Sequence, residues 1–194
     1  MQFYKLINLV LLTIMILALF FIFLSNTNVF TGHATVSNIP SNVSILKYFS
    51  ISASSSISNG ISFGNVQILP ATNINATENY NGTANSTEYY LLVSTDGNAN
   101  VDFCIKANSS LFNSALDEIG FGNESYSNSS SSNSTLPSSL EDVSLELNYV
   151  KAGNNFAPGE NNYYRFFLDI PSGQPAGNYN NTILFKGVQT ESVC

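Results

Sequence analysis

Short runs in which apolar and polar residues alternate constrain the fold of this chain more than any other feature. Period-2 alternation is typical of antiparallel strands that bury one face and expose the other. Gly, Asn, Ser and Pro separate the runs, as expected for turns. The sequence therefore predicts an all-β antiparallel β-sandwich of about seven or eight strands. The runs cover residues 49–53, 61–68, 89–93, 101–107, 143–149, 164–170 and 179–188.

Other segments of the predicted ectodomain, residues 42–194, depart from this alternation. The phase slips by one residue at Gly64–Asn65, which predicts a β-bulge. Leu111–Ile119 has apolar spacing compatible with a short helix. Residues 73–87 and 126–139 are rich in Asn and Ser, and we expect them to be surface loops.

A long apolar segment precedes the alternating region. Leu6–Leu24 contains only Asn8 and Thr13 as polar residues, and as a helix it would rise about 28 Å, close to the thickness of a hydrocarbon core. Lys5 precedes it and no Lys or Arg follows before Lys47, which predicts a cytoplasmic N-terminus and an exported remainder. We expect one hydrophobic helix over residues 1–25, as a signal or transmembrane anchor, a polar stalk over 26–41, and a cell-surface location.

The sequence leaves the processing of this segment open. It is longer than the apolar core of most cleavable signal peptides, which favours a retained anchor. Gly32 and Ala34 nevertheless offer a small-x-small site, so secretion after cleavage near Ala34 is the alternative. The segment resembles a type IV pilin leader only poorly, because Leu6 rather than a small residue follows Lys5.

The stretch Ile170–Tyr179 contains the order Pro175-Ala176-Gly177-Asn178-Tyr179 and runs into the last alternating segment. It resembles the closing corner and strand of secreted immunoglobulin-like domains. The resemblance implies an immunoglobulin-like sandwich in which Gly177 and Tyr179 form a structural corner and the Tyr hydroxyl bonds to nearby backbone. The whole chain is similar to Asn/Ser-rich surface proteins of archaea that carry one leader and one sandwich.

Acceptor sequences for N-glycosylation, Asn-x-Ser/Thr, support export independently of the leader. Several would arise by chance in a chain so rich in Asn, Ser and Thr, but most lie in predicted loops. We therefore expect sugar on several of them in a host that has the transferase. The candidate sites are Asn42, Asn75, Asn81, Asn85, Asn108, Asn123, Asn128, Asn133 and Asn180.

The two cysteines, Cys104 and Cys194, predict a disulfide in an exported chain. Alternation places Cys104 on the face opposite Phe103 and Ile105, so it is not an ordinary core residue. A bridge would close a loop of about 90 residues, worth on the order of 4–5 kcal/mol in the chain-entropy model. Free thiols or a link between subunits are the alternatives.

The run Asp96, Asn98, Asn100 and Asp102 places oxygen ligands at alternate positions, like the start of a calcium loop. Val101 stands where an EF-hand has its turn glycine, and Ala107 stands where it has its bidentate acid. The same residues suit a hairpin turn between the flanking strands, which is the preferred interpretation.

Candidate ligand-binding and catalytic side chains are few. Tyr89–Tyr90 and Tyr163–Tyr164 each place one ring on the outer face, where it could stack on a sugar or pack across strands. His33 is the only histidine and lies in the predicted stalk, which excludes histidine triads in the folded domain. The acid pairs Asp117–Glu118 and Glu141–Asp142 are sequence neighbours, unlike the separated carboxyls of glycosidases.

The net charge limits the classes of partner that the chain can bind. Six basic residues against thirteen acidic residues give a net charge of −7, which argues against a nucleic-acid partner.

We expect a non-enzymatic cell-surface structural or adhesive protein, an envelope component or filament subunit, without a cofactor or metal. It would contact the membrane through its N-terminal helix and bind copies of itself, other surface proteins or glycans. In the filament version, Thr35–Ile45 would add as a strand to a neighbour's sheet edge. The alternative is an exported carbohydrate- or calcium-binding module, and a hydrolase is the weakest hypothesis.

Overall fold

The computed structural model describes residues 2–25, 42–79, 86–132 and 142–194, and it divides the chain into the units 1–44 and 45–194. The first unit contains helix α1 (Gln2–Ser25), whose side chains are described for residues 7–21. The prediction of an N-terminal helix is confirmed. In the described part of the chain, no helix has the combination of length and apolarity that a membrane crossing needs.

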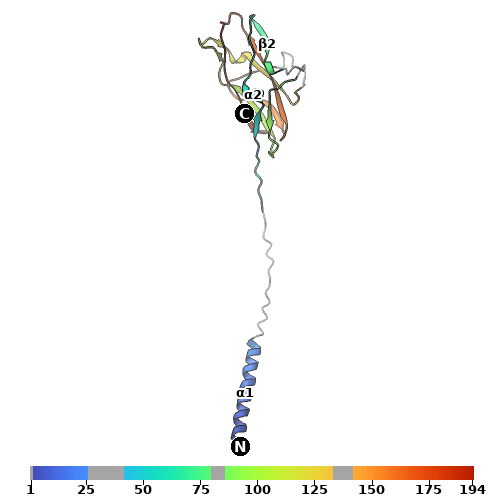
Figure 1. Ribbon diagram of the computed structural model, residues 1–194, viewed down its shortest axis with the longest axis vertical. Helices are drawn as coiled ribbons and strands as arrows, with labels where there is room; N and C mark the ends of the chain where they lie inside the picture. Colours follow the sequence, from blue (N-terminus) through green and yellow to red (C-terminus); the bar gives the residue numbers. More distant parts are fainter. Residues whose placement is uncertain (1, 26–41, 80–85, 133–141) are drawn as a thin grey trace. The chain divides into compact units, whose positions relative to one another are not determined.

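The second unit is mainly β, with two packed antiparallel sheets (Figure 1). The larger sheet has six strands in the order β1-β3-β10-β7-β8, with β2 also paired to β10, and the smaller has the order β11-β4-β9. The predicted two-sheet architecture is confirmed, whereas this strand order does not confirm an immunoglobulin-like topology. The strands are β1 (Ile51–Ala53), β2 (Ala71–Asn75), β3 (Tyr90–Val93), β4 (Val101–Ala107), β5 (Leu111–Phe112), β6 (Glu118–Ile119), β7 (Glu124–Ser129), β8 (Val143–Ser144), β9 (Val150–Phe156), β10 (Asn161–Ile170) and β11 (Ile183–Gln189).

The apolar residues of the alternating strands form the core of the β unit, as the sequence predicts. In β4, Val101, Phe103 and Ile105 face the larger sheet and are fully buried. In β10, Tyr164 and Phe166 face the smaller sheet and contact Phe185 of β11 with ring centroids 5.3 and 6.5 Å apart. These inward faces therefore form one apolar layer between the sheets.

Strand β10 is the hub of the larger sheet. It pairs with β3 through residues 161–163, with β2 through residues 167–170, and with β7 through residues 163–168. Between β3 and β2, the buried side chain of Asn79 takes the place of a strand: its amide donates to the Phe166 carbonyl at 2.8 Å and accepts from the Phe166 N–H at 3.0 Å. Asn79 belongs to the 3₁₀ helix η1 (Thr77–Asn79).

Both predicted Asn/Ser-rich loops are partly wrong. Residues 71–75 form β2, and residues 124–129 form β7, in which Tyr126 is buried opposite Phe166. The polar composition misled because these strands bury few apolar side chains: most residues of β2 are exposed, and the serines of β7 are half-buried on the face opposite Tyr126. The remaining parts of these loops, 80–85 and 133–139, lie outside the described residues.

The predicted helix over Leu111–Ile119 is wrong, because these residues form the hairpin β5–β6. The Asn113 side-chain oxygen accepts from the N–H groups of Ala115 and Asp117, both at 2.9 Å. Leu116 adopts a positive φ of 67°. This side-chain bonding offers the backbone an alternative to a helix, and apolar spacing alone does not reveal it.

Three further expectations fail. Residues 61–68 form no strand and hence no bulge, although Gly64 has a φ of +69°. The segment 96–102 is not a hairpin, because β3 before it and β4 after it belong to different sheets. The predicted strand over 143–149 is only β8, which ends at Ser144. The short helices α2 (Ser55–Asn59) and η2 (Phe121–Asn123) complete the unit.

Candidate functional site

A cavity of about 660 Å³ lies where residues 61–69, the end of β10 and the loop 174–181 meet. This volume falls within the range of small-molecule binding sites. The irregular segment 61–69 forms one wall, and the closing corner of the sandwich forms another. Because its walls come from distant parts of the sequence, the cavity depends on the complete fold.

The floor of the cavity is apolar. Leu111 of β5, Ile119 of β6 and Leu168 of β10 are buried and form a second, smaller core. Phe63 and Ile170 pack against this core and line the cavity. The hairpin β5–β6, which the sequence predicted as a helix, therefore supplies two of the three floor residues.

Amide side chains surround the apolar floor. The side chain of Gln174 donates to the backbone carbonyl of Glu118 at 3.1 Å and to the Tyr179 hydroxyl at 2.9 Å, which fixes its position. The other lining amide residues are Asn65, Gln67, Asn178, Asn180 and Asn181. Such side chains both donate and accept hydrogen bonds, so they suit a ligand rich in hydroxyl groups.

The corner residues Gly177 and Tyr179 hold the loop in place. The Tyr179 hydroxyl donates to the Pro175 carbonyl at 2.8 Å, which is the bond to nearby backbone that the immunoglobulin-like resemblance implies. The Asn113 amide also donates to this hydroxyl, at 3.3 Å. A Cβ at position 177 would lie 2.9 Å from the Asn113 amide nitrogen, so only glycine allows this close approach.

Glu124, the first residue of β7, is the ionisable carboxyl among the cavity-lining residues. Only 3% of it is exposed, and among the described residues its side-chain partner is the Asn181 amide, which donates to Oε2. Burial raises the pKa of Glu124 to about 7, and the hydrogen bond from Asn181 partly opposes that rise. A buried group of this kind in a cleft is a functional-site candidate.

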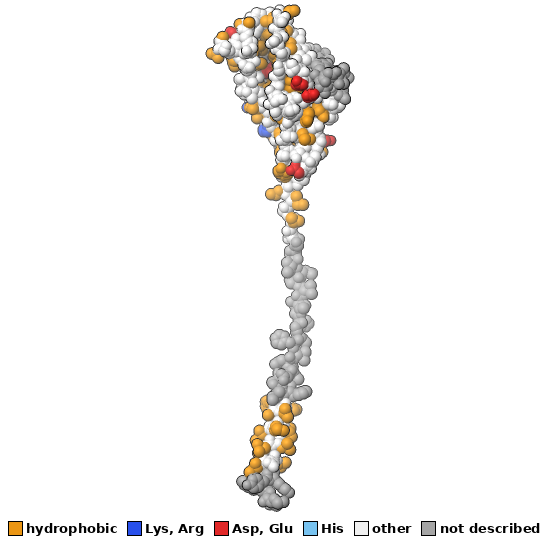
Figure 2. Space-filling model, viewed as in Figure 1, with side chains coloured by type: hydrophobic (Ala, Val, Ile, Leu, Met, Phe, Trp, Pro, Cys, Tyr) orange, Lys and Arg blue, Asp and Glu red, His pale blue; other side chains and the backbone are white. Residues whose placement is uncertain are grey.

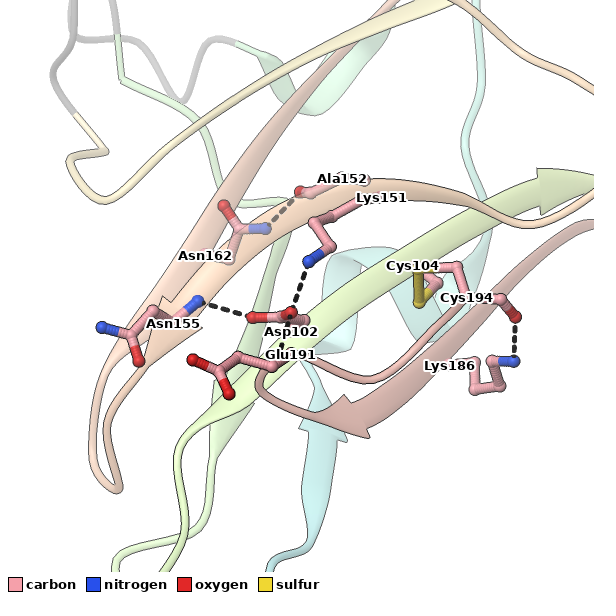
Figure 3. Close-up of a disulfide and its surroundings, with 9 residues drawn as sticks. All are labelled: Asp102, Cys104, Lys151, Ala152, Asn155, Asn162, Lys186, Glu191 and Cys194. Carbon is pink, nitrogen blue, oxygen red and sulfur yellow. Dashed lines mark hydrogen bonds and ion pairs between the residues drawn. A yellow bond between two sulfur atoms is a disulfide. The ribbon is translucent and has the colours of Figure 1, made fainter.

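The predicted calcium ligands are held by separate partners (Figure 3 shows Asp102). Asp96 bonds Ser94, the Asn98 amide bonds the backbone of Leu46 and Tyr48, and Asn100 donates to Asn155 at 2.9 Å. Asp102 points to the outer face of the smaller sheet. Among the described residues, no three His, Cys, Asp or Glu side chains form a group able to hold a metal ion. The calcium site stays a prediction that this arrangement does not support.

Asp102 is instead the centre of a polar network on that outer face (Figure 3). It accepts from Lys151 Nζ at 2.6 Å, from the Asn155 N–H at 2.8 Å and from the Glu191 N–H at 3.3 Å. Burial alone would raise the pKa of Asp102, but these donors outweigh it and the pKa is lowered. The network explains how a fully buried carboxylate is tolerated here.

The predicted Cys104–Cys194 disulfide is confirmed, across 90 positions of the sequence. Cys104 lies on the outer face of β4, as alternation predicts, yet it is fully buried, because the bridge holds residues 190–194 near that face. Lys186 of β11 donates to the Cys194 carbonyl (Figure 3). A disulfide indicates an oxidising compartment, either extracellular or periplasmic.

The tyrosine pairs divide between core and surface as alternation predicts. Tyr89 and Tyr164 are fully buried, whereas Tyr90 and Tyr163 are half-buried and pair across β3 and β10 with ring centroids 5.4 Å apart. This contact accounts for the surface rings without a ligand.

The glycosylation candidates lie in different environments. Asn123 is half-buried, and the described residues that are exposed are Asn42, Asn75, Asn108, Asn128 and Asn180. Asn81, Asn85 and Asn133 lie outside the described residues, as do His33, Ala34, Glu141 and most of Thr35–Ile45. Asp117 accepts from Asn113 at 2.8 Å, and its neighbour Glu118 is exposed.

Sequence reasoning missed the cavity residues Glu124 and Asn181. Each directly follows an acceptor asparagine, at Asn123 and Asn180, so each was noted only as the middle residue of a glycosylation sequence. One sequence signal could have indicated a functional role for Glu124: it is the single charged residue in the segment 120–130.

Comparison with known proteins gives no family assignment. No protein-family model matches the chain, and no curated protein matches it in sequence. The site must therefore be interpreted from its own geometry.

Proposed function

We propose that this chain is an exported, non-enzymatic cell-surface protein whose β-sandwich binds carbohydrate in the cavity beside Glu124. The observation that carries the proposal is the composition of the cavity: an apolar floor, amide walls and one buried carboxyl. Sugars present apolar C–H faces together with hydroxyl groups that donate and accept. A cavity with those two kinds of surface matches both.

The charge of the site favours a neutral sugar. Glu124 is ionised in part near neutral pH, and the protein carries a net charge of −7. Few Lys or Arg side chains are visible on the face of the β unit shown in Figure 2. None of the lining residues that the structure describes is Lys or Arg, so nothing among them would offset the charge of a uronic or sialic acid. Glycosidases use two carboxyl groups flanking the bond, and Glu124 is the single carboxyl in the lining, which supports binding rather than hydrolysis.

Export is supported by the disulfide and by the sequence of residues 6–24. The cytoplasmic N-terminus and the extracellular sandwich are part of the proposal, as is attachment to the membrane through the N-terminal segment. Mass spectrometry of the N-terminus of the protein from its own cells tests this part. A start near residue 35 would replace attachment by secretion.

Calorimetric titration of the full-length protein with neutral and acidic oligosaccharides tests the binding function. Glu124→Gln keeps the shape of the side chain and removes its charge and one acceptor, and we expect it to weaken binding of a neutral sugar about tenfold. The matched control is Tyr163→Ala, which removes an outer-face ring remote from the lining. Loss of binding in the control together with unchanged binding in Glu124→Gln would move the site to the outer tyrosines.

A second candidate function, self-assembly by strand addition, has a separate observation in its favour. The Thr182 carbonyl accepts from the Asn108 N–H, and the Thr190 N–H donates to the Asn100 carbonyl. The even-numbered residues of β11 therefore direct their backbone groups toward β4. Ile183, Phe185 and Gly187 therefore direct their backbone groups to the free edge. Val43, Ile45 and Leu46 are 79–87% exposed and could pair with that edge in another copy.

The self-assembly candidate is tested by light scattering and electron microscopy. We expect the double variant Val43→Asp, Ile45→Asp to abolish assembly, whereas Leu116→Asp, at another strongly exposed apolar position, leaves it unchanged. A wild-type protein that stays monomeric at all concentrations would eliminate this candidate and leave the carbohydrate proposal intact.

A further inference from the structure

The cavity and one acceptor sequence for N-glycosylation share a residue. Asn180 begins the sequence Asn180-Asn181-Thr182 and lines the cavity. The next residue, Asn181, donates to the buried Glu124. None of the other described acceptor asparagines is among the lining residues, so Asn180 differs from them in its position relative to the cavity.

The conformation of Asn180 suits a glycan attachment point. Its backbone is fixed, because its N–H and carbonyl each form a 3.0 Å hydrogen bond with Phe112 of β5. Its side chain is exposed, and the amide nitrogen makes only a 3.4 Å contact with the Asn178 carbonyl in the same loop. By comparison, the Asn123 amide donates to Gly120 at 3.2 Å and the Asn128 amide donates to Asn162 at 3.2 Å.

Thr182, which completes the acceptor sequence, is also exposed. Its backbone N–H donates to the Asn108 side chain at 2.7 Å, and no hydrogen bond from its hydroxyl occurs among the described residues. The hydroxyl is therefore available to a transferase, and replacing it leaves the loop's hydrogen bonds in place.

We propose that N-glycosylation at Asn180 closes the cavity: the attached sugar covers the opening and excludes free ligand. A glycan is bulky, and one attached to a lining residue on fixed backbone stays next to the opening. Its first residues meet the same amide walls that would hold a free sugar, so the attached glycan competes as an intramolecular ligand. The identity of the excluded ligand rests on the proposed function, whereas closure of the cavity does not.

The test uses four full-length proteins, the wild-type sequence and three variants, all with Ile170→Cys, from a host that glycosylates exported chains. Thr182→Val removes the acceptor hydroxyl at nearly constant shape, and Thr182→Ser keeps the acceptor sequence. Ser44→Ala removes the acceptor sequence of Asn42, which is not among the lining residues, and is the matched control. Each variant also carries Ile170→Cys, which places a thiol in the lining, and the rate of alkylation of that thiol reports access to the cavity.

We expect mass spectrometry to find sugar on Asn180 in wild type and in Thr182→Ser, and alkylation about tenfold faster in Thr182→Val than in either protein. The Ser44→Ala control should match wild type. Absence of sugar at Asn180, or equal alkylation rates with and without it, would overturn the inference. Faster alkylation in Thr182→Val without sugar binding in any variant would uphold closure and reject the carbohydrate proposal instead.

Discussion

Asp102 and Glu124 are two nearly fully buried carboxyl groups in one domain, and they respond to burial in opposite ways. Asp102 receives hydrogen bonds from Lys151 and from two backbone N–H groups, and its pKa is lowered. Within the described segments, Glu124 receives one side-chain hydrogen bond, from Asn181, and its pKa rises to about 7. At Asp102 the donors together outweigh the effect of burial, whereas at Glu124 burial outweighs the single donor.

The difference separates a structural carboxylate from a candidate functional one. The Asp102 network joins β4, β9 and the C-terminal segment, so it stabilises the smaller sheet and leaves little acceptor capacity free. Glu124 lines the cavity, and its Oε1 accepts no hydrogen bond among the described residues. The following variants test this contrast.

The largest effect should come from the disulfide that holds residue 191 near Asp102. The double variant Cys104→Ala, Cys194→Ala should lose about 4 kcal/mol of unfolding free energy, because the bridge closes a loop across 90 positions. Urea denaturation at neutral pH measures this loss. The pH dependence that arises from Glu124 should survive in this variant. Unchanged stability would mean that the C-terminal segment is held by its hydrogen bonds alone.

Asp102→Ala should cost about 3 kcal/mol, because two N–H groups lose their acceptor and Lys151 loses its partner. Since the folded pKa is lowered, wild-type stability from this group is present above its ordinary value of 3.8 and is lost as the pH falls through the folded value. The variant should lack that acid-dependent loss. Asp96→Ala, at an exposed position of the same predicted loop, should change stability by less than about 0.5 kcal/mol. Equal effects of the two substitutions would contradict the network.

Glu124→Gln should act in the opposite direction at high pH. The folded protein keeps its proton up to about pH 7 while the unfolded chain releases it near 4.5, so wild-type stability falls between these values as the pH rises. The variant should lose this pH dependence and should be more stable than wild type at pH 8 by roughly 2 kcal/mol. This figure is smaller than the full pKa shift would give, because glutamine also removes the oxygen that accepts from Asn181 or leaves it weaker as an acceptor. Thermal unfolding between pH 4 and pH 8 measures it. Parallel profiles for the two proteins would reject a raised pKa.

The smallest effect concerns the corner that shapes the cavity. Gly177→Ala should cost about 1 kcal/mol and weaken ligand binding, because the added Cβ meets the Asn113 amide. Gly122→Ala is the control, since nothing lies within 4 Å of its Cβ position. Chemical denaturation and calorimetry of both variants separate the corner effect from the general effect of losing a glycine.

The alternation of apolar residues predicted some strands correctly but not all, since residues 61–68 alternate and form no strand. Residues 101–107 form β4 as expected, and both Phe103 in the core and Cys104 on the outer face lie where parity places them. Strands β2 and β7 were not predicted, because they bury few apolar side chains: β2 has no fully buried residue, and Tyr126 is the one buried apolar residue of β7. Alternation in the sequence indicates which face of a strand is buried in the core, but it does not indicate whether other residues cover the opposite face.

The cavity was not predictable from sequence for a related reason. Glu124 and Asn181 are 57 positions apart, and their meeting depends on the pairing of β5 with β6 and on the closing corner. The first of these elements was predicted as a helix. The disulfide, by contrast, required only the count of cysteines and the expectation of export.

The position of β10 in the sheet has a consequence for biogenesis. Its partners β2, β3 and β7 all precede it in the chain, so β2, the β1–β3 pair and the β7–β8 pair cannot join into one sheet until residues 161–170 have been synthesised. Until then the larger sheet is limited to these separate two-stranded pairs, which are only marginally stable in water, so the complete sheet forms late in chain synthesis.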